Sequence, residues 1–527
     1  MQQQVIERAS LSQSVQALDH LSDHDRERFW RFGQGPVMTV PDTHIHRPFE
    51  RYAAIQPDAV AAEHRGETIT YAELNRQANR LATTLAGYGV RPGDNVAVFV
   101  RRGIPMLVGI LGVLKAGGAY VPQDAALAPP AHLRHVIDTA ATRVILTESS
   151  VAHHVPLPAG HHLIHLDTLM AHPLNDDTFR LRAPVSPGEN CYVLFTSGTT
   201  GKPNGVVVTH RNVCNILLTA PGNLGIRPGW TVAQLLNVAF DMAAWEILGC
   251  LSNGGTLAIR GDDVAAAAER ADVIIATPTV LSALDPGRCE SVKVVAVAGE
   301  PCPASLADQW ATRCAFYNGC GPTETTIVNT MHLHDAARQL TIGRPTPNNT
   351  VYVLDPAGRP CRIGEIGEMW AGGDGVSAGY VGNPALNAER YVPDPFLGGG
   401  RLMFRTRDLG HWTHDGRLEH LGRTDDQVKV RGFRVELDSV SAILESVPGC
   451  QRAVTLKLDD RNLVSFVAPS HVDPQTARQA VANALPYYCV PAAIYALPAL
   501  PETSRGKIDK AALRQMAIAD AQLEHVA

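Results

Sequence analysis

The sequence predicts an α/β fold followed by a β-rich region and a small α+β region at the C-terminal end. Short runs of β-branched and aromatic residues, such as 192–195, 273–275 and 292–297, are separated by helical segments. That alternation is typical of largely parallel strands buried beneath helices. After about residue 345, short strands such as 351–354 follow one another between Gly, Pro and Asp turns, which favours a barrel or sandwich.

Composition and charge narrow the class of protein. The 527 residues are 45% hydrophobic and 19% charged, as expected of a globular chain with more than one core. The 46 Lys and Arg against 52 Asp and Glu give a net charge of −6, which disfavours nucleic acid or an anionic membrane as a partner. We find no apolar run of about 18 residues and no secretory signal. Ten cysteines without a CxxC pair indicate reduced thiols, so we expect a soluble cytoplasmic protein.

Three domains are expected along the chain. Residues 1–45 form a polar leader, residues 46–424 a large core, and residues 425–527 a small C-terminal domain. Within the leader, Ser22 precedes an amphipathic turn or two and predicts a helix start. Residues 75–86 carry apolar side chains at helical spacing.

A glycine- and hydroxyl-rich segment, residues 195–205, follows directly after the strand 192–195. Its backbone N–H groups and hydroxyls suit a loop that wraps phosphate oxygens. A P-loop kinase is excluded, because Pro203 follows Lys202 where that motif needs Ser or Thr. The alternative is an ordinary glycine-rich surface turn.

A second such turn, residues 318–326, contains a carboxylate. Glu324 would hold Mg²⁺ beside a triphosphate, because magnesium takes hard oxygen ligands. Alternatively the segment is a helix start capped by Thr323 or Thr325, with Glu324 at the positive helix end.

Taken together, these segments resemble the adenylate-forming superfamily, and specifically the amino-acid adenylation domains of non-ribosomal peptide synthetases. The matches run in order along nearly the whole chain. They are residues 69–75, 114–122, 196–205, 321–326, 367–368 with 372–375, 404–409, 422–432 and 500–509. The resemblance implies a large domain of two layered α/β sheets with a β-barrel-like subdomain, and a small, mobile α+β lid.

The resemblance also implies a two-step reaction that uses MgATP. A carboxylate attacks the α-phosphorus and gives an aminoacyl-AMP and pyrophosphate, and the acyl group then passes to the phosphopantetheine thiol of a carrier protein. Positioning and electrostatic stabilisation would supply most of the catalysis.

Particular residues take roles only through this resemblance. Asp408 would hold the ribose hydroxyls, Lys507 would bridge the substrate carboxylate and the phosphate, and Asp425 would be the hinge of the lid. Lys429 would face the site in the second half-reaction. The implied catalytic residues are Lys507, Thr199, Glu324 (also the Mg²⁺ ligand) and Lys429. The implied nucleotide-binding residues are Thr196, Ser197, Gly198, Thr199, Thr200, Gly201, Lys202, Asn318, Gly319, Cys320, Thr323, Asp408 and Arg423.

Several positions depart from the family pattern. Asn204 stands where a Lys is usual, Cys320 where a Tyr stacks on adenine, and Arg407 where a Gly is usual, and Asp438 and Ser439 replace a Gly-Glu pair. We expect an active enzyme with a weakened affinity for ATP.

Residues 240–246 correspond to the start of the family's substrate pocket. The Asp241 carboxylate would bind an α-ammonium group, although it also suits a helix N-cap. Carried over by register, the pocket comprises Phe240, Asp241, Met242, Trp245, Ile275, Ala296, Ala298, Gly319, Ile327 and Val328, with Lys507. Apart from Asp241 and Lys507 this lining holds no ionisable group, which favours an aromatic or large hydrophobic amino acid. Alternatively, Trp245 caps a small pocket that selects a small or hydroxylated residue.

Only 20 residues follow Lys507, and they contain no carrier motif. We therefore expect a free-standing adenylation protein, or alternatively an excised domain, that serves a separate carrier protein in non-ribosomal peptide or related natural-product biosynthesis, such as that of antibiotics. A small activating helper protein is left open as a further partner. No HExxH or other metal spacing occurs, so no catalytic transition metal is expected. The alternatives are an aryl- or acyl-acid CoA ligase and a catalytically silent regulatory homologue.

Overall fold

Two large sheets occupy most of the first 380 residues in the computed structural model, which describes residues 18–171, 186, 188–198, 202–501 and 508–524. One sheet has nine described strands in the order β15-β14-β13-β12-β11-β9-β10-β1-β2. Its strands are β1 (Val60–His64), β2 (Glu67–Thr70), β9 (Thr231–Gln234), β10 (Thr256–Ile259), β11 (Val273–Ala276), β12 (Val294–Val297), β13 (Ala315–Cys320), β14 (Thr330–Leu333) and β15 (Arg344–Pro345). The pairings from β1 through β10, β9, β11 and β12 to β13 are all parallel, as the sequence predicts.

The second sheet has seven described strands in the order β18-β8-β7-β4-β3-β5-β6. They are β3 (Asn95–Val100), β4 (Ala119–Asp124), β5 (Val144–Thr147), β6 (His162–His165), β7 (Asn190–Thr196), β8 (Asn204–Thr209) and β18 (Gly379–Tyr380). β7 and β8 form an antiparallel hairpin whose connection is the predicted phosphate loop.

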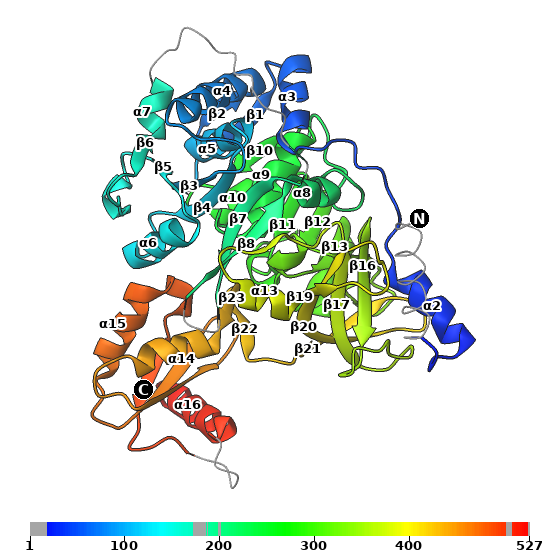
Figure 1. The fold of residues 1–527 in the computed structure, drawn as a ribbon, viewed down its shortest axis with the longest axis vertical. Helices are drawn as coiled ribbons and strands as arrows, with labels where there is room; N and C mark the ends of the chain where they lie inside the picture. Colours follow the sequence, from blue (N-terminus) through cyan, green and yellow to red (C-terminus); the bar gives the residue numbers. More distant parts are fainter. Residues whose placement is uncertain (1–17, 172–185, 187, 199–201, 502–507, 525–527) are drawn as a thin grey trace.

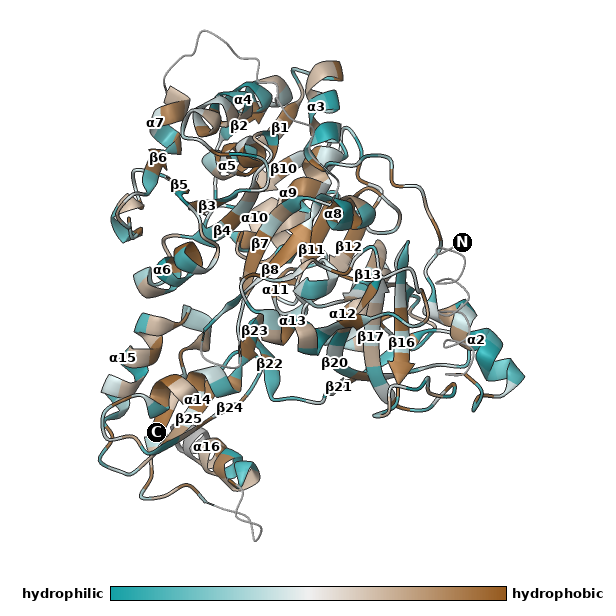
Figure 2. Ribbon diagram, viewed as in Figure 1, coloured by the Kyte–Doolittle hydropathy of each residue, from teal (hydrophilic) through white to brown (hydrophobic). Residues whose placement is uncertain are grey.

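Helices fill the space between these sheets and cover their outer faces (Figure 1). The largest hydrophobic cluster joins side chains of both sheets to α4, α5, α8 and α9, so these helices lie in the shared layer. α5 and α9 are apolar around their circumference, as a buried helix must be, and Figure 2 shows α9 and the strands beside it, such as β11 and β12, mainly in brown. The helices are α3 (His46–Ile55), α4 (Tyr71–Gly87), α5 (Ile104–Lys115), α6 (Pro130–Thr139), η1 (Ala152–His154), α7 (Leu166–Ala171), α8 (His210–Leu217), α9 (Asp241–Ser252), α10 (Val264–Ala268), α11 (Pro278–Leu281), α12 (Ala304–Ala311) and η2 (Thr323–Thr325).

The β-rich region is a third sheet, drawn in yellow-green at the right of Figure 1. It comprises β16 (Asn349–Leu354), β17 (Gly367–Gly373), β19 (Tyr391–Pro393), β20 (Leu402–Trp412) and β21 (Leu418–Arg423), with α13 (Pro384–Arg390) beside β19. Its described strands follow an open path from β16 to β19, with β21 paired to β20, so the expected barrel is not closed. α2 (Asp23–Gly33) packs on this sheet through Phe29 and begins at Ser22, whose side chain accepts the Asp25 N–H, as the sequence predicts.

The last hundred residues form a separate unit, orange to red in Figure 1. The hairpin of β22 (Gln427–Val430) and β23 (Phe433–Glu436) points from this unit toward the two large sheets. The other elements are α14 (Leu437–Glu445), β24 (Arg452–Lys457), β25 (Leu463–Ala468), α15 (Pro474–Ala484), η3 (Tyr487–Cys489), β26 (Ala493–Ala496) and α16 (Lys510–Glu524). The unit has its own cores, one centred on Val435, Val440 and Val467 and the other on Phe466 and Leu513.

Candidate active site

A cavity of about 1530 Å³ lies where the strands of the first two sheets end. Residues that follow β9, β11 and β12, and the last residues of β7 and β13, line one side of it. The β20–β21 strands and the β22–β23 hairpin line the other side. Ligands of parallel α/β sheets bind at this carboxyl edge, because the connecting loops there converge on one crevice.

The predicted phosphate loop lies at the rim of the cavity. Thr196 and Ser197 line it, and Lys202 is exposed outside it. A Cβ on Gly198 would overlap the Lys202 carbonyl oxygen, so the loop requires glycine for close approach of its own backbone. Thr199, Thr200 and Gly201 lie outside the described residues.

Glu324 is fully buried beside this loop, in the turn η2. The Arg434 guanidinium donates to both of its carboxylate oxygens at 2.9 and 3.0 Å, and the Tyr380 hydroxyl donates at 2.7 Å. Burial raises the pKa of Glu324, but the charges of Arg434 and Arg390 and the hydrogen bond from Tyr380 together outweigh burial and bring the pKa to about 2. The capping alternative is not adopted, because Pro322 precedes the turn without a side-chain cap.

Asp408 lies in the long strand β20 and reaches the cavity from the opposite side. Its carboxylate accepts a hydrogen bond from Arg423 at 2.6 Å, and the His420 Nε2 lies 3.3 Å away. Burial raises the pKa of Asp408, but His420 and Arg423 together hold it below its ordinary value. Asp408 is therefore an ionised acceptor at neutral pH.

Arg423 also connects Asp408 to the predicted hinge. It donates to both carboxylate oxygens of Asp425, at 2.8 and 3.1 Å. Arg407, at a left-handed φ of 63°, lies 3.5 Å from Asp425 and also pairs with Glu389. A left-handed residue explains why glycine would fit at this position.

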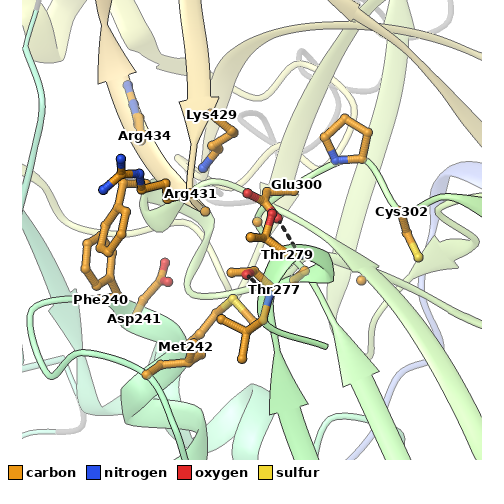
Figure 3. A pocket seen from close by; sticks show the side chains of 18 of the residues that line it. Phe240, Asp241, Met242, Thr277, Thr279, Glu300, Cys302, Lys429, Arg431 and Arg434 are labelled. Carbon is orange, nitrogen blue, oxygen red and sulfur yellow. Dashed lines mark hydrogen bonds between the residues drawn. The ribbon is translucent and has the colours of Figure 1, made fainter. Parts of the chain in front are cut away.

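Asp241 is the first residue of α9, and Phe240, not Asp241, occupies the N-cap position. Burial raises the pKa of Asp241, while a hydrogen bond with the Thr323 side chain and the charge of Lys429 act in the opposite direction. Figure 3 shows the Asp241 carboxylate and the Lys429 ammonium directed into the same cavity. Burial and the Arg434 charge lower the pKa of Lys429, and the two carboxylates of Asp241 and Asp408 oppose that shift.

The other predicted pocket residues divide into two groups. Phe240, Met242, Ala298, Gly319 and Ile327 line the cavity with Asp241. Trp245, Ile275, Ala296 and Val328 lie in the packed core beside it. The Trp245 indole N–H donates to the Gly222 carbonyl at 2.6 Å, which holds the ring in the core.

Most of the described residues that were predicted to bind the nucleotide line the cavity. Asn318, Gly319, Cys320, Thr323, Asp408 and Arg423 line the cavity, as do Thr196 and Ser197. Burial raises the pKa of the Cys320 thiol to about 12, so it stays protonated at neutral pH. Lys507 lies outside the described residues.

Several lining residues escaped the sequence analysis. Thr277 and Thr279 follow β11, and Glu300 follows β12 and accepts the Thr279 N–H at 2.9 Å (Figure 3). Their position just after buried β-branched runs could have identified them as cavity-lining residues. Phe433 of the hairpin contacts Phe240 with ring centroids 4.5 Å apart, and it stacks on Tyr488 with ring centroids 4.1 Å apart. No sequence motif predicted the contact between Phe433 and Phe240, which are distant in the sequence.

Comparison with known proteins identifies the family. The profile of the family described as AMP-binding enzyme matches residues 49–381. The chain belongs to the AMP-binding enzyme family. It is 47% identical to an adenylate-forming reductase of Coprinopsis cinerea, over 95% of this chain and 49% of that protein. It is 38% identical to the isonitrile lipopeptide synthase of Mycobacterium tuberculosis, over 96% of this chain and 21% of that protein.

This AMP-binding enzyme also shares its fold with solved adenylation structures. An artificially fused adenylation–PCP di-domain, NpsA-ThdA from Klebsiella oxytoca, matches with a TM-score of 0.75 and 24% identity, over 86% of this chain and 93% of that one. The family match, the relatives at 38% identity or more and this shared fold together confirm the predicted resemblance to adenylation domains of non-ribosomal peptide synthetases. The chain spans about half the length, or less, of the curated relatives it matches.

None of the described helices is long and apolar enough to cross a membrane. Within the same residues, no group of three or more His, Cys, Asp or Glu side chains is arranged to hold a metal ion.

Proposed function

We propose that this AMP-binding enzyme activates an amino acid as an aminoacyl adenylate with release of pyrophosphate. The observation that carries the proposal is the Asp241 carboxylate, which points into a cavity that Ser197 and Asp408 also line. A half-buried carboxylate of this kind matches an α-ammonium group, since each would otherwise lose hydration without a partner.

The first step joins the substrate carboxylate to ATP. A carboxylate oxygen attacks the α-phosphorus, and the bond from that phosphorus to the pyrophosphate oxygen breaks. In our proposal Asp408 holds the ribose hydroxyls, and the loop that begins at Thr196 and Ser197 holds the phosphates, with Lys507 as a further cation. The adenylate would then lie between the Asp241 and Asp408 sides of the cavity.

Magnesium suits Glu324 chemically. The side chain is a fully buried, ionised carboxylate beside the phosphate loop, and Mg²⁺ prefers such oxygen ligands. When bound there, the ion would neutralise charge on the phosphate oxygens. The Tyr380 hydroxyl keeps the carboxylate oriented through its 2.7 Å hydrogen bond.

In the second step a phosphopantetheine thiol of a carrier protein attacks the acyl carbon. The C–O bond to AMP breaks, and the thiol proton is released. We propose that residues 46–424 form the core and residues 425–527 a lid that turns at Asp425 between the steps. Lys429 lines the cavity in the present orientation of residues 425–527. This position supports the proposal that the present orientation serves the second step. A separate carrier, and a helper protein, are further parts of the proposal.

The preferred substrate is proposed to be an aromatic or large hydrophobic amino acid. Phe240, Met242 and Ile327 offer apolar contact, while Ala298 and Gly319 leave volume between them. The product would enter non-ribosomal peptide or related natural-product biosynthesis.

A second candidate concerns the fate of the acyl group. The matched adenylate-forming reductase of Coprinopsis cinerea is about twice the length of the region that it shares with this chain, so in this second proposal the chain corresponds to the activating part of such a protein. Both candidates share the adenylation step, and they differ in whether the activated group is reduced or enters a peptide.

The test is the selectivity of Asp241→Asn for the α-amino group. The variant keeps the size of the side chain and an acceptor for Thr323, but not the charge. Losing a buried ionic partner costs about 2–5 kcal/mol, so kcat/KM for pyrophosphate exchange with phenylalanine should fall about 30- to 4,000-fold. Exchange with 3-phenylpropanoate, which lacks the amino group, should not fall.

Asp263→Asn is the matched control. Asp263 lines the same cavity, is exposed and caps α10, a role that Asn fills equally well. Its selectivity should equal that of the parent. Equal losses for both acids in Asp241→Asn, or no loss for either, would refute ammonium binding by Asp241.

A further inference from the structure

The β22–β23 hairpin brings a cation onto the proposed magnesium ligand. Arg434 of β23 donates to both Glu324 oxygens at 2.9 and 3.0 Å across 110 positions of sequence. The Glu324 side chain is 0% exposed and that of Arg434 is 14% exposed, so the pair is shielded from water. Arg434 also lies 3.5 Å from Glu436.

The same short segment also contacts the phosphate loop. The Ser197 hydroxyl donates to the Arg434 carbonyl at 3.0 Å, and the Ser439 hydroxyl donates to the Gly198 carbonyl. Ser439 is one of the positions that depart from the family pattern. Residues 434–439 therefore contact both proposed parts of the triphosphate site, the loop and the acid.

Because both are cations, Arg434 and a magnesium ion cannot bind the Glu324 carboxylate at the same time. A buried carboxylate is stabilised by one cation that satisfies its oxygens, and a second cation within a few ångströms is repelled strongly where water is excluded. Arg434 and Tyr380 use the carboxylate oxygens that a magnesium ion would need. Neither cation can leave without replacement, because the bare carboxylate would remain buried and unpaired.

We propose that Arg434 and magnesium exchange on Glu324, so that the ion pair latches residues 425–527 in the present orientation whenever the metal–nucleotide complex is absent. This proposal rests on the proposed function, which supplies the metal and the two orientations. Arg434 is here a positioning residue that acts through Glu324. Departure of pyrophosphate with the metal would free Glu324, and pairing with Arg434 would then favour the orientation that presents Lys429.

A double-mutant cycle on nucleotide binding tests the exchange. Binding of the non-hydrolysable analogue AMPCPP is measured by calorimetry, with Mg²⁺ and with EDTA, and without any acid substrate. Arg434→Gln should tighten Mg·AMPCPP binding about tenfold, because the metal no longer competes with the latch. Metal-free AMPCPP should bind with unchanged affinity, which separates competition for Glu324 from simple unblocking of the phosphate loop.

The second half of the cycle removes the shared carboxylate. In a Glu324→Gln background, Arg434→Gln should give no gain, because nothing is left to exchange. Arg431→Gln is the matched control, since the Arg431 guanidinium donates to the Arg461 carbonyl and Glu324 is bound by the other arginine of the hairpin. It should leave both affinities unchanged. If Arg434→Gln does not fold, Arg434→Lys replaces it in the experiment. Lysine keeps the charge but loses the two-point contact, so the affinity for Mg·AMPCPP should rise about threefold.

Equal Mg·AMPCPP affinity in the parent and the Arg434 variant would overturn the exchange. The same tenfold gain in the Glu324→Gln background, or in EDTA, would also overturn it. Because no acid is present, this result is independent of which acid the enzyme activates. Failure to activate any amino acid would count against the proposed function alone.

Discussion

Replacing Asp408 with Asn separates nucleotide recognition from folding at the proposed ribose site. The variant should keep its fold, because Arg423 retains both hydrogen bonds to Asp425 when the Asp408 charge is lost. The amide offers one acceptor where the carboxylate offered two, so one ribose hydroxyl loses a charged acceptor. Hydrogen bonds to charged groups contribute about 1.5–3 kcal/mol, which predicts a rise in the Kd for ATP of about 10- to 150-fold.

The assay compares ATP with 2′,3′-dideoxy-ATP by calorimetry. The parent should discriminate between them by that factor or more, whereas Asp408→Asn should bind both within about threefold of each other. Asp355→Asn, in an exposed turn where Asp355 pairs with Arg359, is the control and should discriminate like the parent. If Asp408→Asn still distinguishes the two nucleotides as the parent does, Asp408 does not hold the ribose.

Three further changes test other parts of the site. Gly198→Ala should lower the free energy of unfolding by about 1–3 kcal/mol in urea unfolding, because the new Cβ overlaps the Lys202 carbonyl; Gly87→Ala, where nothing lies within 4 Å, is the control, and equal stabilities of Gly198→Ala and the parent would contradict the packing argument. Cys320→Tyr should tighten ATP binding about 2- to 12-fold by stacking on adenine, and an unchanged Kd would dismiss the departure as neutral. Burial raises the pKa of Glu246 from 4.5 to about 8, so the folded state retains a proton that the unfolded state has lost, and stability falls as pH rises from 4.5 to 8. Glu246→Gln should remove up to about 1.4 kcal/mol per pH unit of this slope in urea unfolding at pH 5.5 and 7.5, and an unchanged slope would refute it.

Much of the fold follows from local sequence. The β-branched runs became buried parallel strands because only residues without polar side chains can be covered on both faces of a sheet. Ser22 was predicted to start a helix because its hydroxyl satisfies a free backbone N–H, and it does so in α2. The closed barrel was not predictable in either direction, since strand patterns alone do not determine whether sheet edges meet.

The site was less predictable where geometry decides which residues face the cavity. Ile275 and Ala296 lie within β11 and β12, while the cavity begins beyond the strand ends, at Thr277 and Ala298. The pocket positions carried over from the family pattern could not show where each strand ends and the cavity begins. The pairing of Arg434 with Glu324 was also beyond sequence analysis, because it depends on how the C-terminal unit sits against the core.

Amino-acid-dependent pyrophosphate exchange with MgATP tests the central claim most directly. The panel comprises the twenty common amino acids, several aromatic analogues and the corresponding acids without the α-amino group. The account predicts strong exchange with one or a few aromatic or large hydrophobic amino acids, and little with their counterparts that lack the amino group. Exchange that is equally strong with the acids lacking the amino group, or absent across the panel while ATP still binds, would contradict it.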